Sequence, residues 1–225
     1  ATRYIVAGSF HPAEDTAALL ADLMGAVRRF GIPQRFYSDN GAAFKSRHLA
    51  LAGARLGIQL PHTPPYRPQG RGKIERFFRT VREQFLAEPR GKTLSELNTA
   101  WQEWLAAYHQ ATHASLAVSP LQRRLAVASV CRPVPEATPL EPLFRMERRC
   151  RVYKDGTVRL FGHTFEVPDA IPGTRTTVFF LPRDLSLAWY GDHHQPAIPL
   201  DRSRNARRPL PAVQAAGPEK HHENG

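Results

Sequence analysis

The first third of the chain alternates between extended and helical hydrophobic patterns. Residues 3–10 form a β-prone run, and residues 35–38 and 58–62 are shorter runs of the same kind. Between them, apolar residues recur at helical spacing in residues 19–27 and again in residues 46–56. This strand–helix–strand–helix–strand order predicts an α/β layer with an open sheet. Ligands commonly bind at the carboxyl ends of the strands in such sheets.

The middle of the chain predicts helices. Residues 72–87 have helical periodicity, a capping box at residues 93–96 opens a further helix, and Ser119-Pro120 starts another. The first of these helices is expected to bury one stripe of side chains, at i, i+4, i+7 and i+11. The members of that stripe are Ile74, Phe78, Val81 and Phe85.

The rest of the chain has a different sequence pattern, with prolines and short β-type runs in place of helices. A proline-rich stretch at residues 129–143 predicts a stiff, extended linker. Several short β-type runs follow without helices, which is typical of a small barrel, and Asp155-Gly156 predicts a hairpin turn between the first two. Those runs are residues 150–153, 157–161, 163–167, 175–180 and 187–190. Residues 201–225 are expected to form a basic, disordered tail.

Charge points to a polyanionic partner. The formal net charge is +11, from 31 Lys and Arg against 20 Asp and Glu. Residues 67–92 alone hold eight basic and three acidic side chains. The two cysteines match neither a disulfide framework nor a zinc pattern, so a reducing cytosol is expected. No apolar stretch is long enough to span a bilayer and no signal peptide is present, so no membrane partner is expected.

Two carboxylates are the candidate catalytic groups. Asp39 follows the short run at residues 35–38, and Glu75 comes after a gap of 35 residues, just behind the basic, glycine-rich loop at residues 66–74. Mg²⁺ prefers oxygen ligands and is usually held by one or two carboxylates, with water and substrate phosphate completing its shell. The pair therefore predicts a metal site that acts on a phosphodiester.

Four stretches resemble the integrase core of the retroviral-integrase superfamily, and specifically bacterial insertion-sequence transposases. Residues 38–44 resemble the segment around the family's second catalytic carboxylate, and residues 66–75 resemble its mobile catalytic loop and the start of the helix that bears the catalytic glutamate. Trp104, Tyr108, His113 and Ser119-Pro120 resemble the end of the core, and residues 149–190 look like the carboxy-terminal barrel of Mu-related transposases.

The resemblance implies an α/β, ribonuclease H-like core (a mixed sheet flanked by helices) followed by an all-β barrel. It implies a core at residues 1–128, a linker at 129–143, a barrel at 144–200 and a tail at 201–225. The implied activity is cleavage and strand transfer of DNA by two Mg²⁺ or Mn²⁺ ions, with Asp39 and Glu75 as catalytic metal ligands. The implied partners are transposon-end and target DNA and further copies of the chain, in a bacterial, nucleoid-associated cytoplasmic setting. The residues expected to contact DNA are Asn40, Tyr66, Arg67, Gln69, Arg71, Lys73, Arg76, Arg79 and Arg82.

The chain departs from the family pattern at its beginning. The family's first catalytic Asp lies shortly before a Ser/Thr-Arg pair, whereas here only Ala1 precedes Thr2-Arg3. Asp15 and Asp22 fall in the predicted first helix and are poor substitutes. We therefore expect an amino-terminally truncated core that lacks its first strand in part, its first ligand and any upstream helix-turn-helix, and that is inactive alone.

Simpler interpretations exist for each candidate. Asp39 could cap a turn, and Glu75 could pair with Arg79 on a helix. The basic residues around Glu75 could be a solvated face, and Arg148, Arg149, Arg151 and Arg175 could be a DNA-binding edge of the barrel or only a basic surface. His109 and His113 could bind a metal, although a structural role is favoured because no third ligand is near in the sequence.

Two alternative functions remain open. The chain could be a DNA-binding or assembly module without chemistry, which includes a remnant of an inactivated gene. It could also be another nuclease of the ribonuclease H-like group, although the Tyr66-Arg67-Pro68-Gln69 loop and the barrel argue against that interpretation.

Overall fold

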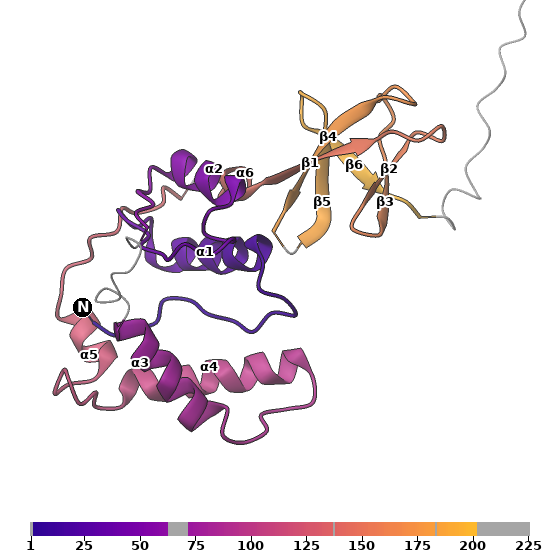
Figure 1. Ribbon diagram of the computed structural model, residues 1–225. Helices are drawn as coiled ribbons and strands as arrows, with labels where there is room; N and C mark the ends of the chain where they lie inside the picture. Colours follow the sequence, from indigo (N-terminus) through magenta and orange to yellow (C-terminus); the bar gives the residue numbers. More distant parts are fainter. Residues whose placement is uncertain (1, 63–71, 137, 183, 202–225) are drawn as a thin grey trace, which may run out of the picture.

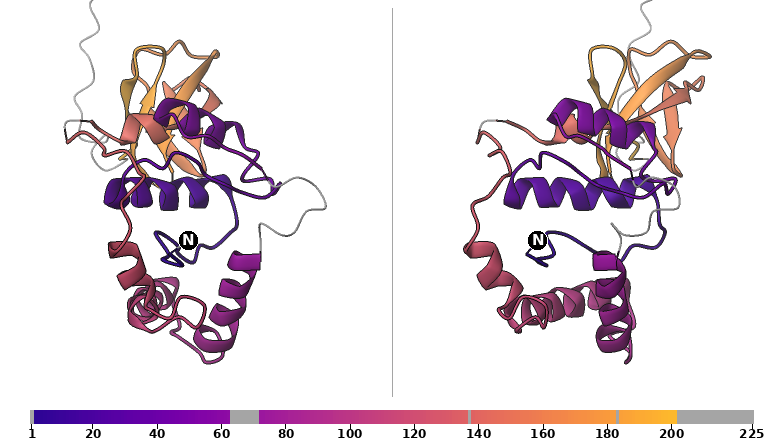
Figure 2. Two further views of the ribbon diagram at one scale, coloured as in Figure 1. Left: turned by 90° about the vertical axis from the view of Figure 1, so that its left-hand side faces the viewer. Right: turned by 60° about the vertical axis from the view of Figure 1, so that its left-hand side comes forward.

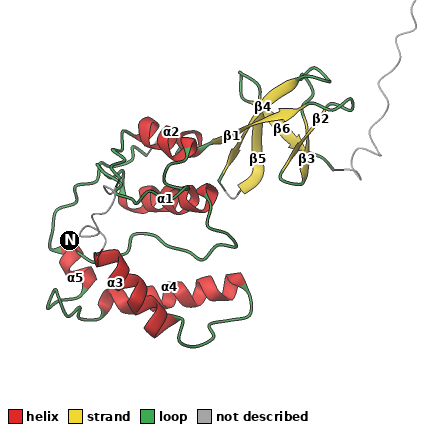
Figure 3. Cartoon of the chain, in the orientation of Figure 1, coloured by secondary structure: helices red, strands yellow, loops and turns green. Residues whose placement is uncertain are grey.

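The computed structural model describes residues 2–62, 72–136, 138–182 and 184–201. Helices α1 to α6 come first in the chain and strands β1 to β6 come last (Figures 1 and 3). Helices α1 and α2 lie between the strands and a second helical layer formed by α3, α4 and α5 (Figures 1 and 2). The predicted order, a mixed helix-and-strand part followed by an all-β barrel, is confirmed.

Helix α1 spans Thr16–Phe30 and begins and ends where its sequence provides caps. The Asp15 carboxylate accepts a hydrogen bond from the amide of Ala18 at 2.8 Å, which satisfies one of the free N–H groups of the first turn. Gly31 ends the helix with a φ of 85°, a conformation that favours glycine. The buried face of α1 carries Leu20, Leu23 and Val27, as the periodicity predicts.

Helix α2 spans Arg47–Leu56, with Ser46 as its N-cap and Gly57 in the left-handed conformation at its end. Gly53 lets the following segment approach the helix closely. A Cβ at residue 53 would lie 2.8 Å from a methyl carbon of Leu60, so a larger side chain would displace this contact. The close approach helps to fix the segment that ends at His62.

Residues 34–39 and 58–62 run parallel and touch through two isolated bridges, Arg35 with Gln59 and Ser38 with His62. The amide of Phe36 donates to the carbonyl of Gln59 at 2.8 Å, and the amide of Gln59 donates to the carbonyl of Gln34 at 3.0 Å. The two strands predicted here are therefore a short parallel pairing rather than members of a longer ladder.

The strand predicted at residues 3–10 is wrong, because the described part of this segment contains no strand. Side chains of α4, which spans Leu94–Gln110, bind its backbone instead. Asn98 accepts from the amide of Phe10 at 2.8 Å and donates to its carbonyl at 2.9 Å. The indole of Trp101 donates to the carbonyl of Gly8 at 2.7 Å. Helix α4 thus provides hydrogen-bond partners for these backbone groups, so they need no neighbouring strand.

Helix α3 spans Gly72–Thr80 and continues as a π-helical turn, η2, at Val81–Phe85. The predicted stripe is half wrong: Val81 and Phe85 are buried, but Ile74 is 45% exposed and Phe78 is 52% exposed. The face that packs on α4 runs through Phe77 instead, whose ring contacts Trp101, Trp104 and Tyr108. Because Phe77, Val81 and Phe85 also recur at four-residue spacing, the sequence supports this stripe as well.

Helices α4 and α5 start at the predicted caps. Thr93 accepts from the amide of Glu96 at 3.2 Å. The returning hydrogen bond differs from a standard capping box, because Glu96 accepts from the amide of Lys92 at 2.7 Å. Helix α5, Pro120–Leu125, has both halves of its box, formed by Ser119 and Gln122.

The stretch predicted as an extended linker is packed against the helices. Residue Arg132 pairs with Ile32 in an antiparallel bridge and donates a hydrogen bond to the carbonyl of Leu56. A four-residue helix, α6, follows at Glu141–Phe144, and its Phe144 is fully buried. The described part of the stretch is mostly exposed, but it is anchored to the helices at Arg132 and Leu140.

The six strands form one antiparallel, nearly closed sheet in the order β1-β4-β5-β6-β3-β2, with β1 and β2 also in contact. Five strands overlap the predicted runs, and the sixth, β6, was missed. Because β6 contains two prolines, its sequence argues against a strand. It pairs with β5 through its first three residues and with β3 through its last two. The strand bounds are β1 Met146–Arg151, β2 Thr157–Leu160, β3 His163–Glu166, β4 Arg175–Leu181, β5 Asp184–Tyr190 and β6 Gln195–Pro199.

The predicted turn at Asp155-Gly156 is present, but β1 and β2 do not form a hairpin ladder. Gly156 has a φ of 70°, and Asp155 accepts from the hydroxyl of Thr157 at 2.7 Å. This hydrogen bond is the main cause that holds the pKa of the Asp155 carboxyl below its ordinary value. Beyond the turn, β1 pairs with β4 and β2 pairs with β3.

Candidate functional site

Asp39 lies where the two parallel segments end. It follows directly on the Ser38–His62 bridge, at the carboxyl end of the first segment, which is the position predicted from the sequence. Its carboxylate accepts a hydrogen bond from the amide of Gly41 at 2.8 Å. A Cβ at residue 41 would lie 3.0 Å from that same oxygen and 3.3 Å from the Phe44 ring. Glycine therefore lets the backbone wrap closely around the carboxylate.

His62 supports Asp39 from the second parallel segment. Its Nδ1 lies 3.1 Å from the carbonyl oxygen of Asp39 and 3.1 Å from the hydroxyl of Ser38. Because a carbonyl only accepts, Nδ1 carries the proton and donates to Asp39. Sequence analysis assigns no role to His62. The available signal was its place at the end of a strand beside the one that delivers Asp39.

Glu75 lies in the first turn of α3 and is exposed. Asn40 is exposed beside Asp39. The loop residues predicted to contact DNA (Tyr66, Arg67, Gln69 and Arg71) lie outside the described residues. The pairing of Asp39 with Glu75 therefore rests on their order in the sequence, on either side of that loop.

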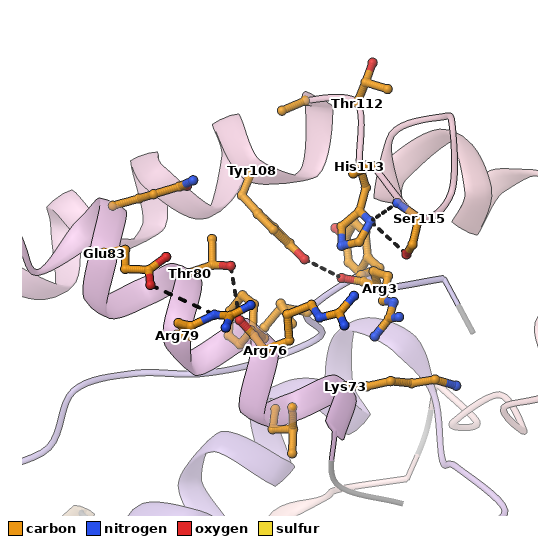
Figure 4. A pocket seen from close by; sticks show the side chains of 17 residues that line it. Arg3, Lys73, Arg76, Arg79, Thr80, Glu83, Tyr108, Thr112, His113 and Ser115 are labelled. Carbon is orange, nitrogen blue, oxygen red and sulfur yellow. Dashed lines mark hydrogen bonds and ion pairs between the residues drawn. The ribbon is translucent and has the colours of Figure 1, made fainter. Parts of the chain in front are cut away.

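Three of the predicted DNA-contacting residues, Lys73, Arg76 and Arg79, line one pocket of about 750 Å³. Arg82 is exposed and is not part of the pocket lining. The pocket lies between α3, the segment 3–5 and the turn at residues 111–115. In Figure 4, Lys73 and Arg76 extend below it, with Tyr108 and His113 above and Arg3 between them. Glu75 is not among the lining residues.

Hydrogen bonds fix parts of the pocket wall. The Tyr108 hydroxyl donates to the carbonyl of Arg3 at 3.5 Å, and the Thr80 hydroxyl donates to the carbonyl of Arg76 at 3.1 Å. Burial raises the pKa of the Tyr108 phenol above 10.0, although the charge of Arg3 opposes that shift. Tyr108 therefore stays neutral and can act as a polar donor.

The structure supports a structural role for His109, one of the two histidines considered as a metal pair. Its Nε2 accepts from the amide of Ile5 at 3.0 Å, and its ring stacks on Tyr4 with centroids 3.9 Å apart. Burial lowers the pKa of His109 below 6.5, and the nearby charge of Arg124 lowers it further. His113 differs, because it faces the pocket and uses Nδ1 to accept from the amide of Ser115 at 3.2 Å.

Within the described ranges, no group of three or more His, Cys, Asp or Glu side chains is arranged to hold a metal ion. By chemistry, the carboxylates of Asp39 and Glu75 are the oxygen donors that Mg²⁺ and Mn²⁺ prefer. The two residues therefore suit such an ion by donor type, and substrate or further protein groups would complete its shell.

Comparison with known proteins gives a match over both carboxylates. Residues 21–91 match the family model described as TnsB C-terminal domain. The transposase for transposon Tn552 of Staphylococcus aureus is 47% identical over 58 residues, which are 26% of this chain and 12% of that protein. The Gag-Pro-Pol polyprotein of sheep pulmonary adenomatosis virus is 33% identical over 88 residues, 38% of this chain and 5% of that protein. The chain thus spans about an eighth or less of these two relatives.

Two solved structures are similar in part. The catalytic core domain of BIV integrase has a TM-score of 0.43 at 22% identity, covering 51% of this chain and 74% of that one. A chain of the simian T-cell lymphotropic virus intasome, solved in complex with PP2A regulatory subunit B56 gamma, also has a TM-score of 0.43, at 17% identity, covering 85% of this chain and 67% of that one. In the described part of the chain, no helix is long and apolar enough to cross a membrane.

Proposed function

We propose that the chain belongs to the transposase and integrase family and that it acts on DNA in transposition, as part of a metal-dependent enzyme for strand cleavage and strand transfer. One observation carries the proposal: Asp39 ends a parallel pair of segments inside the family match at residues 21–91, and that match also contains Glu75. Asp39 thus lies at the carboxyl end of a parallel pairing, the place where ligands commonly bind in α/β proteins.

Asp39 and Glu75 would hold Mg²⁺ or Mn²⁺, two ions in the intact family site. Such ions stabilise the attacking and leaving oxygens at a phosphodiester. The chain's own residues would prepare the site. His62 holds the backbone of Asp39, and Gly41 fixes the orientation of its carboxylate. Interactions of this kind around a ligand typically change metal affinity by about 10- to 100-fold.

The basic residues around Glu75 would bind the DNA backbone. Phosphate contacts of this type are independent of sequence and weaken as salt rises. The formal charge of +11 supports a polyanionic partner. The proposed contacts are those predicted from the sequence, Asn40, Tyr66, Arg67, Gln69, Arg71, Lys73, Arg76, Arg79 and Arg82. The proposed partners are transposon-end and target DNA and further copies of the chain, in a bacterial cytoplasm close to the nucleoid.

The 225-residue chain alone would bind DNA without cutting it. Among the described residues, no group of three or more metal-binding side chains includes these two carboxylates. Two carboxylates can still bind one ion, but the two-ion arrangement that stabilises the transition state should fail. A DNA-binding or assembly module without chemistry is the second candidate function, and the same charge distribution favours it.

Incubation with a supercoiled plasmid tests this proposal, in Mn²⁺ and at two salt concentrations. The expected result is a salt-sensitive gel shift without nicking. Absence of any shift would contradict a function on DNA. Nicking that disappears in Asp39→Asn and Glu75→Gln would support the site but overturn the predicted inactivity, and nicking that survives both changes would overturn the site itself.

A further inference from the structure

The pocket beside α3 is lined by residues on both sides of Glu75 along the helix, but not by Glu75 itself. With 3.6 residues per turn, Lys73, Arg76 and Thr80 share a face that is rotated by about 130° from Glu75. Arg79, one turn after Glu75, also lines the pocket, so a ligand there would lie beside this proposed metal ligand.

The lining is strongly cationic and little neutralised. Arg3, Lys73, Arg76 and Arg79 line the pocket with one carboxylate, Glu83, which lies 4.0 Å from the Arg79 side chain. Among the described residues, no carboxylate forms an ion pair with Arg3, Lys73 or Arg76. Three uncompensated cations around one hollow favour an anionic ligand.

Neutral donors and aromatic rings complete the wall. Because the Ser115 amide donates to Nδ1 of His113, a neutral His113 carries its proton on Nε2, which remains able to donate to a ligand. Phe77, Tyr108 and Tyr4 also line the pocket, with their rings packed on other rings of the protein. A positively charged groove that follows the phosphates is one means by which proteins bind unpaired strands.

The size of the pocket favours a nucleotide over a duplex. Its volume of about 750 Å³ lies within the range of sites that enclose small molecules, about 300–1,000 Å³. A few unpaired nucleotides could enter a hollow of this size, but base-paired DNA could only pass across its mouth.

We propose that this pocket binds an unpaired segment or end of a DNA strand, with Arg3, Lys73 and Arg76 on its phosphates and Nε2 of His113 as a further donor. The inference rests on the proposed function only in taking DNA as the ligand. It adds a single-strand site on α3 beside Glu75, which would hold one strand while the other strand is at the carboxylates.

The test measures binding of the full chain to a fluorescein-labelled ten-nucleotide single strand and to a blunt hairpin duplex, without metal. The pocket variant is Lys73→Ala with Arg76→Ala. The matched control is Arg123→Ala with Lys154→Ala, which removes the same charge at two exposed positions outside the pocket. The pocket variant should weaken single-strand binding at least tenfold, and the control less than twofold. In the pocket variant, duplex binding should fall by a clearly smaller factor than single-strand binding.

Equal losses in the two double variants, or an equal loss for single strand and duplex, would overturn the pocket and indicate general electrostatic attraction. Thermal melting of each variant identifies misfolding, and His113→Ala provides a second, uncharged test that should weaken single-strand binding about threefold or more. Asp39→Asn with Glu75→Gln should not weaken single-strand binding, because it removes only negative charge. Failure of the metal site is thereby distinguished from failure of the pocket.

Discussion

At the scale of single residues, Asp39 is held in place from two directions. Gly41 donates to its side chain, and His62 donates to its main-chain carbonyl. The first contact is local, and an Asp-Asn-Gly sequence predicts it. The second depends on the register between two segments more than twenty residues apart, which the Ser38–His62 bridge sets. Sequence reasoning could identify Asp39 for this reason, but it could not identify His62.

His109 links pH to stability. Its Nε2 accepts from the amide of Ile5, so the folded state needs the neutral ring, and burial lowers the pKa of His109 below its ordinary value of 6.5. The unfolded chain therefore binds a proton at a higher pH than the folded chain does. His109 contributes stability that is fully present above about pH 6.5 and is lost as pH falls through that value toward the lower folded pKa.

Urea unfolding at pH 7.5 and pH 5.5 measures this effect. The natural chain should lose stability on acidification, and His109→Gln, which keeps an acceptor but does not titrate, should lose less. The comparison uses the pH-dependent change within each protein, because the substitution also alters stacking on Tyr4. An identical pH-dependent loss in both proteins would contradict the role of His109.

At the scale of elements, packing decides which face of α3 and η2 is buried. The stripes Ile74–Phe78–Val81–Phe85 and Phe77–Val81–Phe85 both have helical spacing, so periodicity alone cannot choose between them. The aromatic face of α4 chooses the second, because Phe77 and Phe85 both contact Trp101 and Trp104. That information lies in the partner helix and is not local to α3.

Two alanine substitutions test this choice of face. Phe85→Ala removes a fully buried ring and should lower the free energy of unfolding by about 3–5 kcal/mol. Phe78→Ala changes a half-exposed ring and should cost less than about 1 kcal/mol. Urea denaturation gives both values. Equal losses, or a larger loss for Phe78→Ala, would mean that the originally predicted stripe is the buried one.

Two further elements show why local patterns were insufficient. Residues 3–10 have strand-like composition, but Asn98 and Trp101 of α4 satisfy their backbone, so no strand is needed. Strand β6 has proline-rich composition, but it divides its pairing between β5 and β3 at a corner of the barrel. In both cases, residues distant in the sequence provide the hydrogen-bond partners of the backbone.

At the scale of the whole molecule, the barrel is attached to α1 and α2 through a shared core. Leu140 and Phe144 are buried in the same cluster as residues of α1, α2 and the strands. Polar contacts reinforce the junction: Arg47 pairs with Glu147 at 2.8 Å and Arg28 pairs with Glu141 at 2.6 Å. The second buried cluster, around Phe85 and Trp101, lies on the other side of α1.

This division gives Asp39 and the basic pocket different supports, whereas Glu75 shares α3 with the pocket. The parallel segments that deliver Asp39 pack on the cluster shared with the barrel, through Phe36 and Phe44. The basic pocket is built on the separate cluster of α3, η2 and α4. Changes in the pocket should therefore disturb Asp39 little, which makes the two proposals separable by experiment.

The central claim is that Asp39 and Glu75 together bind a divalent ion for chemistry on DNA. The most direct test is a titration of Mn²⁺ into the full chain with duplex DNA present, following free Mn²⁺ by electron paramagnetic resonance. The natural chain should bind Mn²⁺, and Asp39→Asn and Glu75→Gln should each weaken that binding at least tenfold, whereas Glu83→Gln should not. Failure of the natural chain to bind Mn²⁺, or equal binding in all four proteins, would contradict the account.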